Sequence, residues 1–460
     1  MEGQKSHTHS IQIDTDKCIG CSHCVHVCST KAIRIEAGHA HIRSHRCIDC
    51  GECYRVCPQH AIYAKDSGLG MLQQGGYNIA LLPSVFIGQF SADYSVNGIL
   101  EAVEKIGFNE VVEVEQSVDF IKEAYRSIAE REVSRPLISS FCPAVVRLIQ
   151  VAYPSLTEWI IPLKEPLDLT ARYLRKSKEE AGWKPSQIAI YYITPCAAKI
   201  VSPHTTSKKG QPSIDGTIKM TELYNRVSKI LLDKKESEYR RAYGCLSPDS
   251  VCWSLSGIEK KYFPGRSLAI DGMDNVIEFL EKLESGQIRG IDFLEMRACD
   301  QGCAGGILCP GNRFLTVERL EQREKKLKRR QENDRAEAAN PLMAYREDLH
   351  SIAANGPILP RDDLQLDKNM ERALVKLQRI ERLMTYLPGF DCGACGAPTC
   401  RSLAEDIVQG KASISYCVFV QRVMEKNYKL SPDQAFTVIE KIWGKDRLNK
   451  YSDPHENEIK

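Results

Sequence analysis

A pattern of four cysteines occurs twice near the start of the chain and constrains its fold more than any other feature. CIGCSHCVHVC begins at Cys18 and CIDCGECYRVC begins at Cys47, so each cysteine recurs after 29 residues. The spacing CxxCxxCxxxC lets three thiolates of one tight loop reach three corners of an iron–sulfur cubane. A zinc site or a disulfide knot is the alternative, but zinc is satisfied by four ligands at looser spacing. The repeat therefore predicts a pseudo-symmetric pair of iron–sulfur sites.

The repeat resembles the two-cluster ferredoxins of bacteria, in which the fourth cysteine of each run binds the other cluster. The resemblance implies one 4Fe-4S cluster on Cys18, Cys21, Cys24 and Cys57, and a second on Cys47, Cys50, Cys53 and Cys28. Ala32-Ile33 and Ala61-Ile62 recur as well, which suits matching strands or packing positions under the two clusters. We expect an α+β two-cluster ferredoxin domain over residues 1–67.

Composition narrows the class of protein and its compartment. A chain of 460 residues has room for about three domains of ~150 residues each. The 62 basic and 60 acidic residues leave a net charge of +2, so we expect neither nucleic acid nor a membrane as partner. Nineteen cysteines at metal-ligand spacings indicate reduced thiols, and no segment approaches the ~18 apolar residues of a membrane span. The first residues also lack the apolar stretch of a secretion signal, so we expect a soluble cytoplasmic protein.

Apolar runs alternate with helical patterns in the middle of the chain. Strands are predicted at NIALLPSVFIG, FNEVVEV, PLISS and IAIYYIT, and helices at GILEAVEKIG and VDFIKEAYRSIAE. This is the order of parallel α/β units, in which the loops after the strands carry functional residues. Three such loops contain cysteine: SSFCPAV at Cys142, ITPCAAK at Cys196, and EMRACDQGCAGG at Cys299 and Cys303. A lone cysteine is more often a buried core thiol, but the four together favour a metal site.

The three loops resemble, in order and separation, the signature loops of the iron-only (FeFe) hydrogenase catalytic domain. The likeness extends to Leu82-Pro83-Ser84-Val85, to GTIKMTEL and to DGMDNVIEFLEKLESGQIRGIDFLEMRAC. It covers residues 78–348 and implies an α/β hydrogenase-like catalytic-type domain. It also implies a 4Fe-4S cubane on Cys142, Cys196, Cys299 and Cys303, with Cys303 bridging to a two-iron subcluster that carries carbonyl, cyanide and dithiolate ligands. Lys199 and Ser84 match donors of hydrogen bonds to that subcluster.

Several positions depart from this family pattern. Phe141 stands where active members have a cysteine that passes protons, and the methionines of the second and third loops are Thr194 and Arg297. The glycine triplet after the last cysteine is shortened to Gly305-Gly306, and Glu123 is the one relay acid that the pattern leaves. Proton transfer needs a positioned group within hydrogen-bond reach, so the side-chain route is predicted to be cut. Such divergence is typical of the sensory or uncharacterised branches of the family.

A third cysteine motif lies near the C-terminus. A helix is predicted over residues 374–387, and FDCGACGAPTC follows it directly. The motif resembles the 4Fe-4S domain of corrinoid iron–sulfur proteins and electron-transport complexes, and its four cysteines are Cys392, Cys395, Cys400 and Cys417. Zinc remains an alternative here, because four thiolates suit it as well. We expect a small helical 4Fe-4S domain over residues 370–430 and a C-terminal tail over 431–460, while the charged run 318–338 is predicted to be a solvated helix.

These observations lead to one hypothesis and two alternatives. We expect four 4Fe-4S clusters, with a two-iron subcluster as a further cofactor, in a hydrogen or redox sensor of low turnover. Its partner would be a redox protein, either ferredoxin-like or a separate signalling protein. One alternative is an active ferredoxin-dependent hydrogenase, which combines two protons and two electrons into H2, and the other is an iron–sulfur assembly factor. Three cysteines stay unassigned: Cys245, Cys252 and Cys309.

Overall fold

The computed structural model describes residues 9–130, 136–201, 213–233, 246–333, 341–347, 356–361, 366–367 and 369–445. The chain forms two compact units. One unit joins Met1–Ala64 to Arg361–Lys460, and the other is Lys65–Pro360. The two ends of the chain thus fold together, although their cysteine motifs place them in separate predicted domains. The predicted domain boundaries themselves stay predictions.

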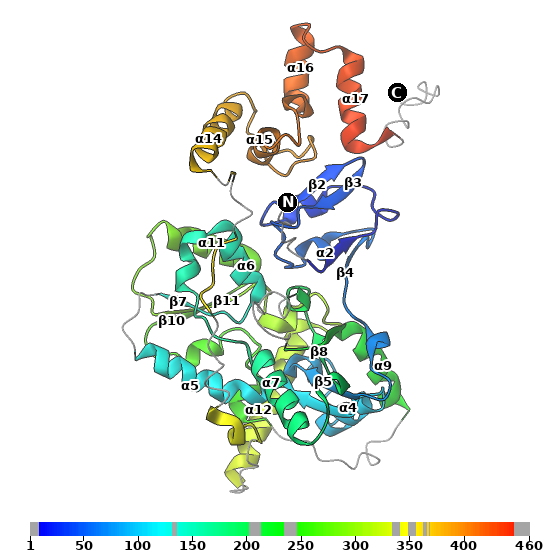
Figure 1. Cartoon of the computed structure of the whole chain (residues 1–460), viewed down its shortest axis with the longest axis vertical. Helices are drawn as coiled ribbons and strands as arrows, with labels where there is room; N and C mark the ends of the chain where they lie inside the picture. Colours follow the sequence, from blue (N-terminus) through cyan, green and yellow to red (C-terminus); the bar gives the residue numbers. More distant parts are fainter. Residues whose placement is uncertain are drawn as a thin grey trace. The chain divides into compact units, whose positions relative to one another are not determined.

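The N-terminal half of the first unit consists of two short antiparallel strand pairs. Strand β1 (Ile11–Ile13) pairs with β4 (Ile62–Ala64), and β2 (Ile33–Glu36) pairs with β3 (His39–Ile42). Helix α1 (His23–Val27) contains Cys24 and helix α2 (Glu52–Val56), which is labelled in Figure 1, contains Cys53; the two helices pack against each other. The repeated Ala-Ile pairs are buried and stand at the starts of β2 and β4, as the sequence repeat predicts.

Four helices form the C-terminal half of this unit: α14 (Met370–Met384), α15 (Cys400–Val408), α16 (Val418–Lys426) and α17 (Pro432–Trp443). Helix α14 begins before the predicted apolar stripe, because the Asn369 side chain caps it by accepting from the Arg372 N–H at 3.1 Å. Helix α17 lies within residues 431–460, for which a C-terminal tail is predicted. It begins with a capping box, in which Ser431 and Gln434 bind each other's backbone N–H groups.

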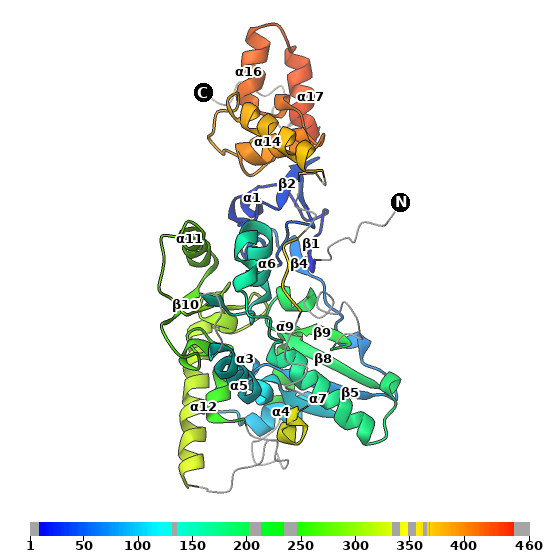
Figure 2. The same cartoon turned by 60° about the vertical axis from the view of Figure 1, so that its left-hand side comes forward.

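The first sheet of the second unit is parallel, in the order β6-β5-β8-β9. Its strands are β5 (Tyr77–Leu82), β6 (Glu110–Glu113), β8 (Ile188–Thr194) and β9 (Gly216–Lys219). Alternate residues of β5 enter different cores, as strand geometry requires. Ala80 and Leu82 belong to the core that includes residues of α4 (Val96–Glu104) and α9 (Met220–Leu232), whereas Ile79 and Leu81 pack with α7 (Pro166–Glu180) (Figure 2).

A second parallel sheet has the order β10-β11-β7. Its strands are β7 (Leu137–Ile138), β10 (Ser267–Asp271) and β11 (Phe293–Arg297). Phe293 packs with residues of α5 (Val118–Ala129), while α11 (Met273–Glu284) contacts β10 and β11. The parallel α/β character is therefore confirmed.

The predicted charged helix is present as α12 (Arg313–Asn333). Several short helices complete the second unit, among them α3 (Ser84–Ile87), α6 (Pro143–Ala152) and α10 (Pro248–Val251). Within the part of the chain that the structure describes, no helix is both long and apolar enough to cross a bilayer.

Candidate functional site

The first ferredoxin-type set is brought together from both halves of the repeat. Cys18, Cys21, Cys24 and Cys57 line one pocket between the two cysteine loops. Burial, and after it the neighbouring Cys18, Cys21 and Cys57, together raise the pKa of Cys24 to about 12. Four cysteine sulfurs around one pocket are a ligand set that an iron–sulfur cluster or a metal ion can use.

The second set has the same arrangement with the two runs exchanged: three of its cysteines come from the second run and the fourth comes from the first. The pKa of Cys50 is raised to about 12 by burial and then by Cys28, the last cysteine of the other run. Burial also raises the pKa of Cys53, which is increased further by Cys50, Cys47 and Cys28. Backbone amides point at the sulfurs of the crossing cysteines: Ala32 N–H donates to Cys28 Sγ at 3.2 Å, and Ala61 N–H donates to Cys57 Sγ at 3.3 Å.

The C-terminal set occupies a loop and two helix starts. Cys392, Cys395, Cys400 and Cys417 line one pocket. Cys400 is the first residue of α15, whose cap Thr399 accepts from the Ser402 N–H at 3.0 Å, and Cys417 directly precedes α16. Burial, and to a smaller extent Cys417 and Cys392, together raise the pKa of Cys395 to about 11. Cys392 is exposed, whereas the other three are half-buried or buried.

The central set lies beyond the carboxyl ends of parallel strands, where open α/β sheets place their ligands. Cys142 follows β7, Cys196 follows β8, and the pair Cys299 and Cys303 follows β11. Burial, Cys303 and Cys142 together raise the pKa of Cys196 to about 12, against the opposing effect of Lys199. Cys299 is half-buried, and its carbonyl accepts from the Gly302 N–H at 3.1 Å. The assignment of all four sets as ligands stays a prediction.

A small pocket lies against Cys303. Its wall includes Glu115, Phe141, Lys199, Trp253 and Ser254. Phe141 is 8% exposed, and its ring is held between two cations: Lys199 Nζ lies 4.2 Å and Arg297 Cζ lies 4.0 Å from the ring centroid. The two replacements that the sequence singles out, Phe141 and Arg297, are therefore in direct contact.

Buried carboxylates hold both cations. Lys199 pairs with Glu165, and both side chains are nearly inaccessible to solvent. Burial alone would lower the pKa of Lys199, but Glu165 and the Cys303 thiolate raise it above its ordinary value. Arg297 Nη2 lies 3.0 Å from Glu259 Oε2 and 3.4 Å from Glu295 Oε1. Both cations thus remain charged inside the protein.

Several buried donors around this pocket have no hydrogen-bond partner among the described residues. They are the Ser84 and Ser254 hydroxyls, the Trp253 indole N–H, and the Nε and Nη1 groups of Arg297. Buried donors are normally satisfied, so these groups fit a bound partner with acceptor atoms, as cluster sulfides or anionic ligands would supply. The residues present therefore suit the iron–sulfur group that the sequence implies.

Sequence reasoning missed one acid at this pocket. Glu115 is buried, and its carboxylate accepts the Ser84 backbone N–H at 2.9 Å on both oxygens. Burial raises the pKa of Glu115 to about 7, and the bond from Ser84 opposes this shift only in part. Its position just after β6, opposite Ser84 at the end of β5, was the available signal. Glu123, the acid that the sequence favoured, lies on α5 and pairs with Arg346 at 3.0 Å rather than lining the pocket.

The remaining positions have local explanations. Thr194 Oγ1 donates to the Cys196 carbonyl at 2.7 Å and accepts from the Cys196 N–H at 3.3 Å, so it braces the second cysteine loop. Cys309 Sγ donates to the Cys303 carbonyl at 3.4 Å, which places it beside the central set. Cys252 is a buried core thiol, and Cys245 lies outside the described residues.

His9, Cys47 and Asp49 also place ligand atoms within 4.8 Å of one another. The Asp49 carboxylate is already used, because Oδ1 accepts from the backbone N–H of Ser10 at 2.8 Å and of Ile11 at 3.2 Å. Since Cys47 belongs to the second ferredoxin-type set, this trio describes how β1 is anchored to the second cysteine loop.

Three sequence families match the chain. Residues 79–257 match the iron only hydrogenase large subunit, C-terminal domain; residues 10–58 match the 4Fe-4S dicluster domain; and residues 387–419 match an Fe-S cluster family. Each match contains predicted ligands: Cys142 and Cys196 in the first, all eight repeat cysteines in the second, and Cys392, Cys395, Cys400 and Cys417 in the third.

Curated relatives match parts of the chain. The periplasmic Fe hydrogenase large subunit of Nitratidesulfovibrio vulgaris is 28% identical over 249 residues, which are 49% of this chain and 59% of the relative. A component of the ion-translocating oxidoreductase complex of Rhodobacter capsulatus is 45% identical over 38 residues, 8% of this chain and 20% of the relative. The chain thus spans about three fifths of the first relative and a fifth of the second.

Two FeFe-hydrogenase structures are similar to this chain at low identity. One, from work on stepwise H-cluster assembly, has a TM-score of 0.46 at 15% identity and covers 62% of this chain and 95% of that chain. The other, a variant enzyme from Chlamydomonas reinhardtii, has a TM-score of 0.43 at 16% identity and covers 54% of this chain and 83% of that chain.

Proposed function

Because this chain belongs to a divergent FeFe-hydrogenase-like family of iron–sulfur proteins, we propose that it acts as a hydrogen or redox sensor of low turnover. The observation that carries the proposal is the position of Phe141. Its ring lies against the two buried cations at the pocket beside Cys303, where active relatives are expected to have a proton-passing thiol. A phenyl ring neither gives nor takes a proton, so turnover loses its nearest donor.

The proposal includes four 4Fe-4S clusters, one for each set of four cysteines, and a two-iron subcluster beside Cys303. The subcluster would supply the site at which hydrogen binds. Lys199 and the Ser84 hydroxyl are among the donors available to its anionic ligands. A redox protein, either ferredoxin-like or a signalling protein, would exchange electrons with the chain.

Metal and sulfide analysis tests the cluster count. Anaerobically reconstituted protein is expected to contain about 16 iron and 16 sulfide per chain, four of each per cubane. Stoichiometric zinc, or about half that iron, would contradict it.

Infrared spectroscopy and gas assays test the sensor role. Protein matured with the hydrogenase assembly enzymes should show carbonyl and cyanide bands that shift when hydrogen or carbon monoxide is added, yet it should evolve hydrogen slowly. Fast hydrogen evolution by the unmodified protein would overturn the sensor role.

One observation favours the active hydrogenase as a second candidate. Glu115 is an acid at the wall of the same pocket with a pKa of about 7, close to the value at which a group both gives and takes protons near neutral pH. If this candidate holds, the wild type turns over quickly and Glu115→Gln turns over slowly.

A further inference from the structure

The loop that carries the first two cysteines of the C-terminal set is in close contact with the ferredoxin-type half of the same unit. Ile35 N–H of β2 donates to the Gly396 carbonyl at 2.8 Å. Gly396 has a φ of +78°, and a Cβ there would lie 2.5 Å from the Ile35 carbonyl oxygen. Gly393 has a φ of +73°, and a Cβ there would lie 3.3 Å from Cε1 of His26. Glycine at these positions lets the two backbones approach this closely.

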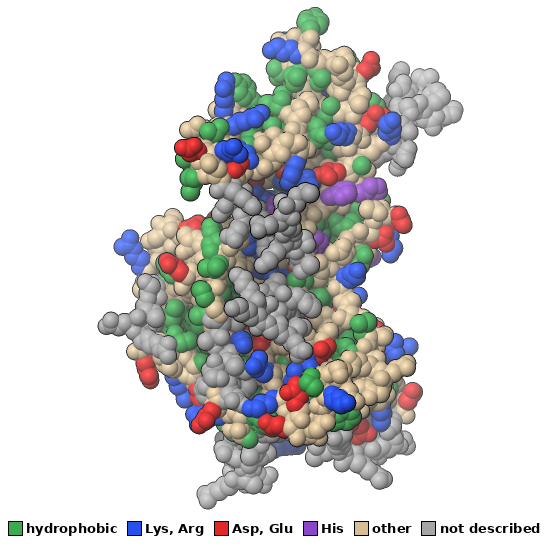
Figure 3. All heavy atoms as spheres, viewed as in Figure 1, with side chains coloured by type: hydrophobic (Ala, Val, Ile, Leu, Met, Phe, Trp, Pro, Cys, Tyr) green, Lys and Arg blue, Asp and Glu red, His purple; other side chains and the backbone are tan. Residues whose placement is uncertain are grey.

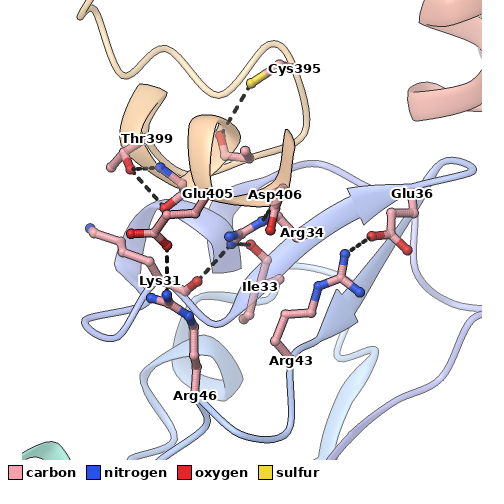
Figure 4. Close-up of polar contacts among 12 residues, drawn as sticks. Lys31, Ile33, Arg34, Glu36, Arg43, Arg46, Cys395, Thr399, Glu405 and Asp406 are labelled. Carbon is pink, nitrogen blue, oxygen red and sulfur yellow. Dashed lines mark hydrogen bonds and ion pairs between the residues drawn. The ribbon is translucent and has the colours of Figure 1, made fainter. Parts of the chain in front are cut away.

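Two ion pairs hold helix α15 to the same half, as Figure 4 shows. Arg34 Nε lies 2.5 Å from Asp406 Oδ2, and the Arg34 side chain is 4% exposed. The Arg34 guanidinium also donates to the Lys31 carbonyl at 2.8 Å, so it is fixed from both sides. Arg46 Nη2 lies 2.7 Å from Glu405 Oε2. Helix α15 begins with Cys400, so these pairs fix a predicted ligand of the C-terminal set.

The C-terminal end of α17 forms hydrogen bonds with both the ferredoxin-type half and the C-terminal cysteine loop. Ala37 N–H donates to the Lys441 carbonyl at 3.0 Å, and Gly38 N–H donates to the Ile442 carbonyl at 2.9 Å. The indole N–H of Trp443 donates to the Ala394 carbonyl at 3.0 Å, between Cys392 and Cys395. The turn between β2 and β3 is thus joined to the C-terminal cysteine loop through one helix end.

His26 lies close in sequence or in space to predicted ligands of three cysteine sets. His26 lies on α1 between Cys24, assigned to the first ferredoxin-type set, and Cys28, assigned to the second. Its ring faces Gly393, between Cys392 and Cys395 of the C-terminal set. One contact therefore lies next to predicted ligands of three sets.

The outer side of the C-terminal set faces solvent. Cys392 is the one exposed cysteine among the described residues. Two residues before it, Phe390 is 67% exposed and its ring lies 5.3 Å from that of Phe419. Figure 3 shows hydrophobic side chains on the surface over α16, the helix that carries Phe419.

We propose that the C-terminal set and the two ferredoxin-type sets form one built-in electron relay, joined at the contacts of Gly393 with His26 and of Gly396 with Ile35, with the C-terminal set as its solvent-facing end. The proposal rests on the proposed cluster occupancy. In each transfer a reduced cluster at the C-terminal set loses one electron and an oxidised ferredoxin-type cluster gains it, and no bond or proton changes place. An external one-electron donor of low potential supplies the electron.

Electron paramagnetic resonance of the dithionite-reduced, full-length protein tests the relay. Two nearby unpaired spins split or broaden each other's signals. Cys417→Ser, which removes a ligand of the C-terminal set, should therefore sharpen the ferredoxin-type signals by removing a neighbouring spin. Unchanged ferredoxin-type signals in this variant would overturn the relay.

Gly396→Ala tests the contact itself against a matched control. The added methyl group meets the Ile35 carbonyl, so the loop must move away; the part of the splitting that Cys417→Ser also removes should be lost, while iron and sulfide content stay at the wild-type level. Gly410→Ala introduces the same backbone strain at a φ of +73°, but nothing lies within 4 Å of the new Cβ, so the splitting should persist. Equal spectra in the two variants would overturn the proposal.

A second pair of variants guards against a folding defect. The double variant Glu405→Gln and Asp406→Asn removes both ion pairs at nearly constant shape and should weaken the splitting. Glu381→Gln breaks an exposed ion pair with Arg401 in the same half, in which the paired atoms lie 2.9 Å apart, and it should leave the splitting unchanged. Iron and sulfide are measured first in every sample, so absent clusters would refute the proposed function, whereas bound clusters whose ferredoxin-type signals do not respond to Cys417→Ser would refute the relay alone.

Discussion

Each ferredoxin-type site and the central site has a predicted set of four cysteines, but the groups that surround the sulfurs differ in charge. At the ferredoxin-type sites, the sulfurs of Cys28 and Cys57 accept from neutral backbone amides. At the central site, Lys199 and Arg297 lie beside Cys303, and buried glutamates pair with both. Amide donors follow from local loop geometry, whereas buried charges depend on residues far apart in sequence. Single substitutions of these buried charged residues should therefore change the electrostatics of the central site more than substitutions near the ferredoxin-type sites change theirs.

The largest expected effect is at the bridging position. Cys303→Ser should abolish the carbonyl and cyanide bands of matured protein and leave the ferredoxin-type signals intact, because the two sets of cysteines lie in different compact units. Cys309→Ser is the control, since its thiol contacts the Cys303 carbonyl but belongs to no predicted set. Unchanged infrared bands in Cys303→Ser would show that this cysteine is not the bridge.

Buried and exposed charges should differ in their effect on stability. Arg297→Met leaves Glu259 and Glu295 unpaired in the core, so the free energy of unfolding should fall by about 3–5 kcal/mol. Arg43→Met in the ferredoxin-type half breaks a partly exposed pair with Glu36, and the loss should be at most about 1 kcal/mol. Denaturant titrations at matched iron content measure both, and equal losses would remove this distinction between the regions.

Glu115 should make the central unit sensitive to pH. Its pKa is about 7 in the folded chain and 4.5 as the ordinary value, so the folded state binds the extra proton and stability falls as pH rises from 4.5 through 7. The full loss amounts to about 3 kcal/mol. Glu115→Gln should remove this part of the slope, so its melting temperature should exceed that of the wild type increasingly toward neutral pH. Parallel curves for the two proteins would mean that Glu115 is not protonated in this range.

Phe141→Cys restores a proton-passing group at the central site. Hydrogen evolution should rise by about 100-fold if this thiol alone is missing. Phe141→Leu is the control, because it removes the ring between Lys199 and Arg297 without supplying a proton donor. A slow Phe141→Cys variant would locate the obstacle in the rest of the relay, and equal gains in both variants would mean that bulk, rather than the missing thiol, limits turnover.

The sequence predicted much of the fold because its signals were local. The CxxCxxCxxxC repeat and the apolar runs of β5 and β8 depend on residues close together in the chain. The contact between Phe141 and Arg297 could not be predicted in this way, because β7 and β11 bring together positions 156 residues apart. Glu115 was missed for the same reason, since it becomes distinctive only when β5 and β6 pair and burial shifts its pKa. Helix α17 was not predicted, although Ala435, Ile439 and Ile442 recur at helical spacing behind a capping residue, so this signal was local and available in the sequence.

The pairing of Arg34 with Asp406 also has a consequence for synthesis on the ribosome. The two residues are separated by 372 positions, yet the Arg34 side chain is almost fully covered in the finished protein. At 5–20 residues per second, the ribosome adds Asp406 roughly 20 to 70 s after it adds Arg34. During that interval the β2 surface that later receives the C-terminal helices is uncovered, and so is the polypeptide that binds the first clusters. Nascent chains of this protein should therefore be most vulnerable to oxygen and to aggregation before the segment that contains Asp406 is made.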